Sequence, residues 1–205
     1  MKVNFTCIIP TIGRACLRTA LDSIAAQDLR KNDQIIVVSD TLSRSQPETK
    51  RIVKKYGEPF EYHEFAGTQH FYGMEQRTYG LKLAREGNYL TWIDDTDFYM
   101  TEAWKVMRER IAETQETLPH VFGFVAAWGV VPGANIAEGL IGSHNFVTPN
   151  VKGMVGSWMK NGGYRYQSDF DFIVSTLALW KNRIMWHNEF ISDARGGYAG
   201  QVVNA

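Results

Sequence analysis

Three carboxylates stand within four residues near the middle of the chain, at Asp94, Asp95 and Asp97. They follow residues 89–93, a short apolar run rich in β-forming side chains, which predicts a buried strand that ends at the acidic cluster. Unpaired carboxylates at this spacing repel one another and resist burial, and a divalent cation removes that conflict. Hard oxygen ligands at positions i and i+2 suit Mg²⁺ or Mn²⁺, which commonly also hold substrate phosphates. A solvated acidic turn fits the spacing equally well, and the strand before it favours the metal site.

The residues before this cluster alternate between strand and helix patterns. The expected elements are strand 3–9, a helix with an apolar stripe over 17–25, strand 34–39, helix 47–56, strand 60–65, helix 75–86 and the acidic strand. This order predicts βαβ units with right-handed crossovers and a largely parallel sheet. Ligands of such sheets bind beyond the carboxyl ends of the strands, where the acidic cluster stands. Gly80, inside a predicted helix, indicates a close approach of the backbone to a neighbouring element.

The second half of the chain is less regular. Thr101 is suited to cap a helix that runs to about residue 117, and residues 121–131 predict one further strand. Residues 133–163 carry seven glycines without clear periodicity, which indicates loops and short strands. A last helix begins at Ser168, and the tail from Met185 onward is polar and contains glycine. No linker divides the two halves, so the second half is expected to extend the same sheet.

Composition limits the classes of function. The chain of 205 residues carries 22 basic and 22 acidic side chains, so a strongly basic face for duplex nucleic acid is not evident. The two cysteines, Cys7 and Cys16, have no metal-binding spacing and are expected to be core thiols in a reducing, cytoplasmic compartment. The apolar part of the N-terminus is too short for a signal peptide. No apolar run approaches the roughly 18 residues of a membrane span.

Four stretches of the chain together resemble the glycosyltransferases of family 2 with the GT-A fold. The first three are CIIPTIGR with its following helix, IIVVSD, and GLKLAREGNYLTWIDDTD, and the fourth is SDFDF at residues 168–172. The resemblance spans roughly residues 4 to 180. It implies an α/β, Rossmann-like GT-A fold, with a largely parallel central sheet flanked by helices and a small, irregular C-terminal acceptor part. It also implies one domain over residues 1–205, with a nucleotide-binding half at about 1–100 and an acceptor half at about 101–205.

The resemblance implies metal-dependent, inverting transfer of a sugar from a UDP- or GDP-sugar donor to an acceptor hydroxyl. The cofactor would be Mn²⁺ or Mg²⁺. Asp169 would be the general base. The donor would be bound by Thr11, Arg14, Asp40, Arg77, Asp94 and Asp95. The metal would be held by Asp95 and Asp97, with His187 as a further candidate ligand. Two positions depart from the family pattern, since Thr96 and Ser168 stand where acids are common.

Several of these residues also have a structural interpretation. Ser168 is a good N-cap with Asp171 three residues later, so Asp169 also suits a helix N-terminus. Asp40 fits a turn residue, and Arg77 and His187 fit solvated surface side chains. Four aromatic residues, Trp128, Trp158, Tyr164 and Tyr166, are candidates to stack on sugar or base rings, or are simply part of the core.

Two other classes of function compete with sugar transfer. A nucleotidyltransferase of similar fold usually shows a glycine-rich, basic loop after its first strand, whereas PTIGR contains one glycine. A non-catalytic relic that binds nucleotide sugars is disfavoured by the intact acidic triplet. The acceptor stays open among a glycan, a lipid-linked sugar, a protein and a modified nucleobase, and the sequence gives no oligomeric state.

Overall fold

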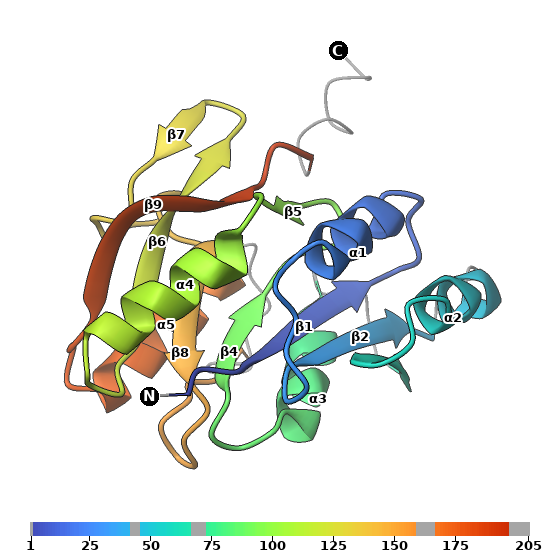
Figure 1. Cartoon of the computed structure of the whole chain (residues 1–205), viewed down its shortest axis with the longest axis horizontal. Helices are drawn as coiled ribbons and strands as arrows, with labels where there is room; N and C mark the ends of the chain where they lie inside the picture. The colour runs from blue at the N-terminus through green and yellow to red at the C-terminus, as the bar shows by residue number, and fades with distance from the viewer. Residues whose placement is uncertain (1, 42–45, 67–72, 159–166, 197–205) are drawn as a thin grey trace.

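The computed structural model describes residues 2–41, 46–66, 73–158 and 167–196. The strands of this part of the chain form one sheet in the order β3-β2-β1-β4-β8-β6-β9-β5, with β7 paired to β6 (Figure 1). No helix in these residues is long and apolar enough to cross a membrane.

The first half of the sheet is parallel. Strands β1, β2, β3 and β4 pair in parallel register, with β1 between β2 and β4. The elements of this half are β1 (Phe5–Thr11), α1 (Leu17–Ala25), β2 (Gln34–Asp40), α2 (Gln46–Lys54), β3 (Phe60–Phe65), α3 (Met74–Leu83) and β4 (Tyr89–Trp92). The predicted alternation of strands and helices is therefore confirmed, with ends that shift by up to three residues.

The second half of the sheet is mixed. Strand β8 is antiparallel to both β4 and β6, and β9 is parallel to β6 and antiparallel to β5. The elements of this half are β5 (Phe98–Tyr99), α4 (Ala103–Glu113), β6 (His120–Ala126), β7 (Gly129–Val131), the 3-10 helix η1 (Ser143–Asn145), β8 (Phe146–Pro149), α5 (Ser168–Leu179) and β9 (Met185–Asp193).

Two expectations for this half are wrong, and one strand was not predicted. Residues 121–131 form the antiparallel pair β6 and β7 instead of one strand, because the chain turns at residues 127–128. The polar tail from Met185, for which no element was predicted, begins with strand β9, of which only the last three residues are buried. Helix α4 is not capped by Thr101, since Glu102 occupies the N-cap position at φ 60° without a side-chain cap.

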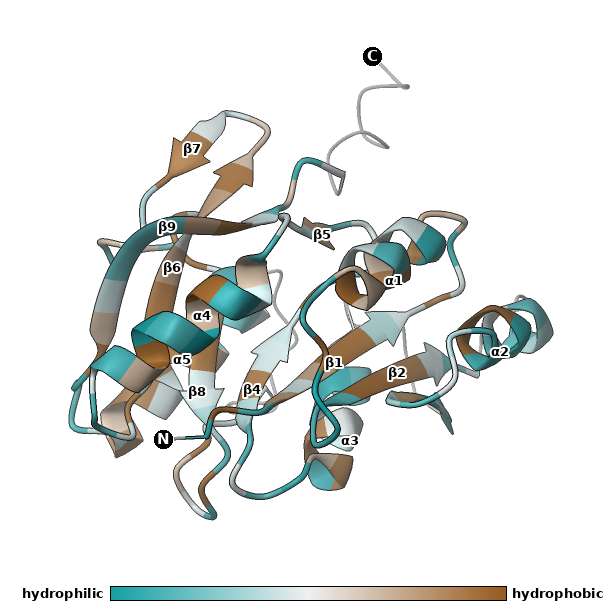
Figure 2. Ribbon diagram, in the orientation of Figure 1, coloured by the Kyte–Doolittle hydropathy of each residue, from teal (hydrophilic) through white to brown (hydrophobic). Residues whose placement is uncertain are grey.

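Helices cover both faces of the sheet. Buried residues of α1 and α4 share one core with Phe5, Cys7 and Ile9 of β1, while Ile8 points into a second core with residues of α3 and α5. Figure 2 shows hydrophobic residues along β1 and β2, and mixed hydrophobic and hydrophilic residues on α1 and α4. The two-residue alternation of β1 thus supplies both cores, as expected for a strand buried on both faces.

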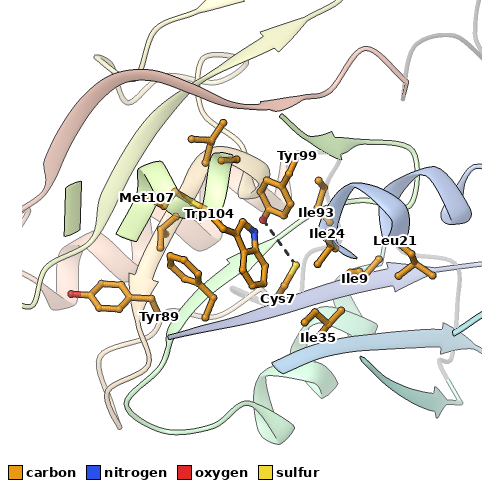
Figure 3. Close-up of a cluster of buried hydrophobic side chains, with 14 of the residues drawn as sticks. Cys7, Ile9, Leu21, Ile24, Ile35, Tyr89, Ile93, Tyr99, Trp104 and Met107 are labelled. Atoms are coloured by element: carbon orange, nitrogen blue, oxygen red, sulfur yellow. Dashed lines mark hydrogen bonds between the residues drawn. The ribbon is translucent and has the colours of Figure 1, made fainter. Parts of the chain in front are cut away.

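The first core encloses one of the two cysteines. Figure 3 shows Cys7 among side chains of α1 and α4, with the Tyr99 hydroxyl 4.0 Å from its Sγ atom. Burial raises the pKa of Cys7 to about 12, so the thiol stays protonated. Both Cys7 and Cys16 are free, but only Cys7 is buried, so the expected core thiol is confirmed for Cys7 and wrong for the half-buried Cys16.

The sheet topology gathers several chain segments at one edge. Because β8 is antiparallel to β4 and β6, strands β1, β2, β4, β6 and β9 all run in the same direction. Their carboxyl ends therefore meet at one edge, and η1 lies there too because it directly precedes β8. The acidic cluster follows β4 at this same edge.

Gly80 lies where α3 packs on the sheet. A Cβ atom at this position would lie 2.6 Å from Cγ2 of Ile8 and 3.4 Å from Cγ2 of Val38. The close backbone approach that the sequence predicted is therefore confirmed.

We expect Gly80→Ala to destabilise the protein, although alanine is favoured over glycine in helices by about 1 kcal/mol. Overpacking costs about 1–3 kcal/mol and outweighs that gain. Urea unfolding of Gly80→Ala, Ile8→Ala and the double variant forms a double-mutant cycle. The penalty of Gly80→Ala should disappear in the Ile8→Ala background, and a Gly80→Ala variant more stable than the wild type would contradict the prediction.

Candidate active site

Asp95 ties together the loops that follow β1 and β4. Its Oδ2 accepts a hydrogen bond of 2.6 Å from Thr11 Oγ1, and its Oδ1 accepts one of 2.7 Å from Arg14 Nη1. The Gly13 backbone N–H in turn donates to Thr11 Oγ1 at 2.9 Å. The Asp95 side chain is 1% exposed, so a buried carboxylate with both oxygens bonded fixes the geometry of these loops.

The neighbouring acids face a different space. A cavity of about 250 Å³ is lined by residues from six segments of the chain. They include Arg77 of α3, Asp94 and Asp97 after β4, Trp128 between β6 and β7, His144 of η1, and Asp169 of α5. Asp95, which was predicted to share a metal ion with Asp97, is not among the lining residues.

Arg77 supplies a buried positive charge next to these acids. Its side chain is 3% exposed and donates to Asp94 Oδ1, and its guanidinium lies over the Trp158 ring at 4.9 Å. Trp158 is stacked on Phe172 with ring centroids 4.2 Å apart. Arg77 is therefore not a solvated surface charge, since a carboxylate and an aromatic face hold it in place.

Asp94 and Asp97 hold their protons more tightly than ordinary carboxyls. The surrounding protein desolvates the carboxyl of Asp94 and raises its pKa, whereas the positive charge of Arg77 opposes that shift. The Asp94 side chain is still 44% exposed, because it faces the cavity. Burial, followed by the negative charge of Asp94, raises the pKa of Asp97 to about 8, against a hydrogen bond from Thr96 Oγ1. The cavity thus concentrates more negative charge than its surroundings stabilise.

Asp169 enters the cavity from the first turn of α5. Its Oδ2 accepts hydrogen bonds from the backbone N–H of Ser143 at 3.0 Å and from Ser143 Oγ at 2.8 Å. It lines the same cavity as Asp94 and Asp97, and its charge contributes to the raised pKa of each. Asp169 and the acidic loop therefore belong to the same cavity although they are about 70 residues apart in the sequence.

Besides Asp95 and its partners Thr11 and Arg14, two further predicted site residues do not line this cavity. Asp40 is 1% exposed at the carboxyl end of β2, on the same edge of the sheet. His187 lies near the start of β9, where its Nε2 is 2.9 Å from Nδ1 of His120. The acidic loop lies beyond the other end of that strand, roughly 20 Å away at the rise of an extended chain. His187 is thus not placed to share an ion with Asp97.

The aromatic residues that were candidates for stacking on a ring lie in different environments. Trp158 is 1% exposed and belongs to the core beneath Arg77, whereas Trp128 is 58% exposed and lines the cavity. Tyr164 and Tyr166 lie outside the described residues.

Other residues of the site carried no signal in the sequence. Ser143 and His144 come from a glycine-rich stretch without periodicity, and burial lowers the pKa of His144 to about 4, so its imidazole is neutral near pH 7. Gly196 packs on the acidic loop, because a Cβ atom there would lie 1.8 Å from the Thr96 carbonyl oxygen. Only the folded chain brings these segments to the acids.

The described residues contain no group of three or more histidine, cysteine, aspartate or glutamate side chains arranged to hold a metal ion.

Comparison with known proteins identifies the family of the chain. The model of glycosyl transferase family 2 matches residues 6–165. The chain belongs to glycosyl transferase family 2. A search of curated proteins finds no match.

Solved structures agree with the family in fold. S. aureus TarS is similar with a TM-score of 0.73 and 18% identity, over 99% of this chain and 40% of that chain. TarS 1-349 in complex with UDP-GlcNAc is similar with a TM-score of 0.67 and 18% identity, over 94% and 58%. The mannosyltransferase PcManGT from Pyrobaculum calidifontis, in complex with GDP-Man and Mn²⁺, has a TM-score of 0.60 and 12% identity, over 97% and 59%. The chain thus spans 40 to 59% of the length of these three structures. The predicted GT-A fold is confirmed.

The raised pKa of Asp97 predicts a stability that falls as pH rises. The folded carboxyl holds its proton up to about pH 8, whereas an unfolded aspartate loses it near pH 4. Between these values the folded state binds more protons, so each step up in pH costs stability. In EDTA, Asp97→Asn should therefore be more stable than the wild type near pH 8, and the difference should vanish near pH 4.

Urea unfolding across this pH range measures the effect, and Glu109→Gln on the exposed side of α4 is the control. A constant difference between Asp97→Asn and the wild type at every pH would contradict the prediction.

Proposed function

We propose that the chain transfers a sugar from a UDP- or GDP-sugar donor to an acceptor hydroxyl, with inversion, at the cavity described above. One observation carries the proposal: Asp94 and Asp97 of the loop after β4 and Asp169 of α5 line one cavity beside the buried Arg77, in a chain of glycosyl transferase family 2. Residues 1–205 would act as one domain, with a nucleotide-binding half at about 1–100 and an acceptor half at about 101–205.

The donor would lie along the carboxyl ends of β1, β2 and β4. Thr11 and Arg14 are held there by Asp95, and Arg14 remains half-exposed, so its guanidinium can reach an anionic ligand. Asp40, at the end of β2, would accept hydrogen bonds from the nucleoside. The complexes of TarS with UDP and UDP-GlcNAc and of PcManGT with GDP-Man support a nucleotide sugar.

A divalent cation, Mn²⁺ or Mg²⁺, fits the chemistry of this cavity. Asp97 and Asp94 offer hard oxygen ligands, and the pKa of Asp97 is raised by burial and by the negative charge of Asp94, a conflict that a cation relieves. Asp95 would position Arg14 and Thr11 instead, because both of its oxygens are already bonded. When bound, the ion would stabilise the negative charge of the departing diphosphate.

The chemical step would be a single displacement. Asp169 would take the proton of the acceptor hydroxyl as the acceptor oxygen forms a bond to C1 of the sugar. The bond between C1 and the phosphate oxygen breaks, and the electron pair leaves with the nucleoside diphosphate. Both hydrogen bonds from Ser143 go to Oδ2 of Asp169, so the proton would be taken by Oδ1. Arg77 would supply positive charge beside the leaving group.

Nucleotide binding should require the cation. We expect UDP or GDP to bind with Mn²⁺ at least tenfold more tightly than in EDTA, and Asp97→Ala to lose most of that difference because it removes a ligand. Isothermal titration calorimetry with each nucleotide measures both effects and distinguishes the two bases. Equal affinity in Mn²⁺ and EDTA would remove the metal from the proposed mechanism.

Loss of the general base should slow the reaction without removing the donor. Asp169→Asn keeps the shape of the side chain and can still accept the Ser143 bonds, but it takes no proton at the reacting hydroxyl. We expect the rate of UDP or GDP release from a panel of nucleotide sugars to fall about 10²–10⁴-fold.

Asp171→Asn, in the same first turn of α5, is the matched control. It should change the free energy of unfolding by about 1 kcal/mol or less, through the helix dipole, and leave the rate near that of the wild type. An inactive Asp171→Asn variant or a fully active Asp169→Asn variant would show that Asp169 is not the general base.

A further inference from the structure

Trp128 stands at an unusual place for a large aromatic side chain. It lies in the turn between β6 and β7, it is 58% exposed, and it lines the same cavity as Asp169. Figure 1 shows the β6–β7 pair extending beyond the helices that cover the sheet. An exposed indole at the mouth of a polar cavity presents a flat apolar surface to whatever enters.

Glu138 adds an exposed carboxylate to the wall of the cavity. Its backbone pairs with that of Ile141, which fixes the segment just before η1. Gly142 continues this segment, and a Cβ atom there would lie 2.5 Å from Cε1 of His144. The segment that carries Glu138 therefore leads directly into Ser143, which holds Asp169.

We propose that the acceptor is a carbohydrate, whose sugar ring lies flat on Trp128 and whose hydroxyls donate to Glu138. This inference rests on the proposed function, because it names the acceptor of that reaction. One face of a pyranose consists of C–H groups that pack on an aromatic ring, and its edge carries hydroxyls that suit carboxylates. Trp128 and Glu138 offer these two surfaces on one cavity, and Asp169 lies there to take the proton of the reacting hydroxyl.

The charge of the cavity argues against an acceptor that carries phosphates close to the reacting group. The described lining contains four carboxylates, from Asp94, Asp97, Glu138 and Asp169, against the single guanidinium of Arg77. A nucleobase within a nucleic acid would bring backbone phosphates towards these carboxylates, whereas an uncharged sugar would not.

The test observes Trp128 directly. In ¹⁵N-labelled protein with diamagnetic Mg²⁺ and the nucleotide that calorimetry selects, the Trp128 indole N–H signal is the one missing from Trp128→Phe. Methyl glycosides of glucose, galactose, mannose and N-acetylglucosamine are added separately, and deoxycytidine serves as the nucleobase probe. Trp186, which is 39% exposed on β9 outside the cavity, is the internal control and is assigned with Trp186→Phe.

We expect at least one methyl glycoside to shift the Trp128 signal and not that of Trp186. Glu138→Gln should weaken binding of that glycoside roughly tenfold, through the loss of charge-assisted hydrogen bonds. Trp128→Ala should raise the KM for the same glycoside as acceptor by at least tenfold. Trp128→Phe, which keeps an aromatic ring, should have a KM close to that of the wild type, and Trp186→Ala should have the wild-type KM.

A shift of Trp128 with deoxycytidine alone would overturn the inference in favour of a nucleobase acceptor. No shift with any probe, in protein that binds the nucleotide, would overturn it while leaving the proposed function standing. Failure to bind or hydrolyse any nucleotide sugar would instead overturn the proposed function itself.

Discussion

The mutual repulsion of carboxylates in one cavity is the constraint around which this structure is arranged. Asp94, Asp97 and Asp169 meet there, and burial with this shared charge raises the pKa of Asp97 to about 8. The protein offsets part of the charge with Arg77, whose guanidinium is fixed between Asp94 and the Trp158 ring. The Trp158–Phe172 stack beneath it is therefore part of the support of the site as well as of the core. The remaining negative charge is the physical basis of the proposed cation site.

Sheet topology explains why such distant segments share one site. The strands that carry Thr11, Asp40 and the acidic loop are neighbours in the order β2-β1-β4, so their carboxyl ends supply one half of the edge. Strand β8 reverses direction between β4 and β6, which puts the end of β6, the start of β8 and the end of β9 at the same edge. The reversal thus lets the mixed half of the sheet face its parallel half across the acids.

Asp95 and Asp169 show that aspartate side chains serve two different purposes in this fold. Both carboxylate oxygens of Asp95 accept hydrogen bonds from Thr11 and Arg14, so its negative charge is stabilised by other residues of the protein. Asp169 uses only Oδ2 in its hydrogen bonds to Ser143, and those bonds aim its carboxylate into the cavity. Acids of the same chain are therefore not equivalent, because hydrogen-bond partners from other elements decide which of them faces the cavity.

The sequence by itself determined the alternation of strands and helices up to the acidic cluster, since hydrophobic periodicity reports local burial. It also indicated the close packing of Gly80 and the candidate acids, because both depend on residue type at one position. Only the tertiary structure decided that Asp95 turns inward while Asp97 faces the cavity, that His187 pairs with His120, and that Met185–Asp193 forms a strand of the sheet. It likewise buried Trp158 and exposed Trp128. These outcomes depend on strand register and on partners distant in the sequence, which no local pattern contains.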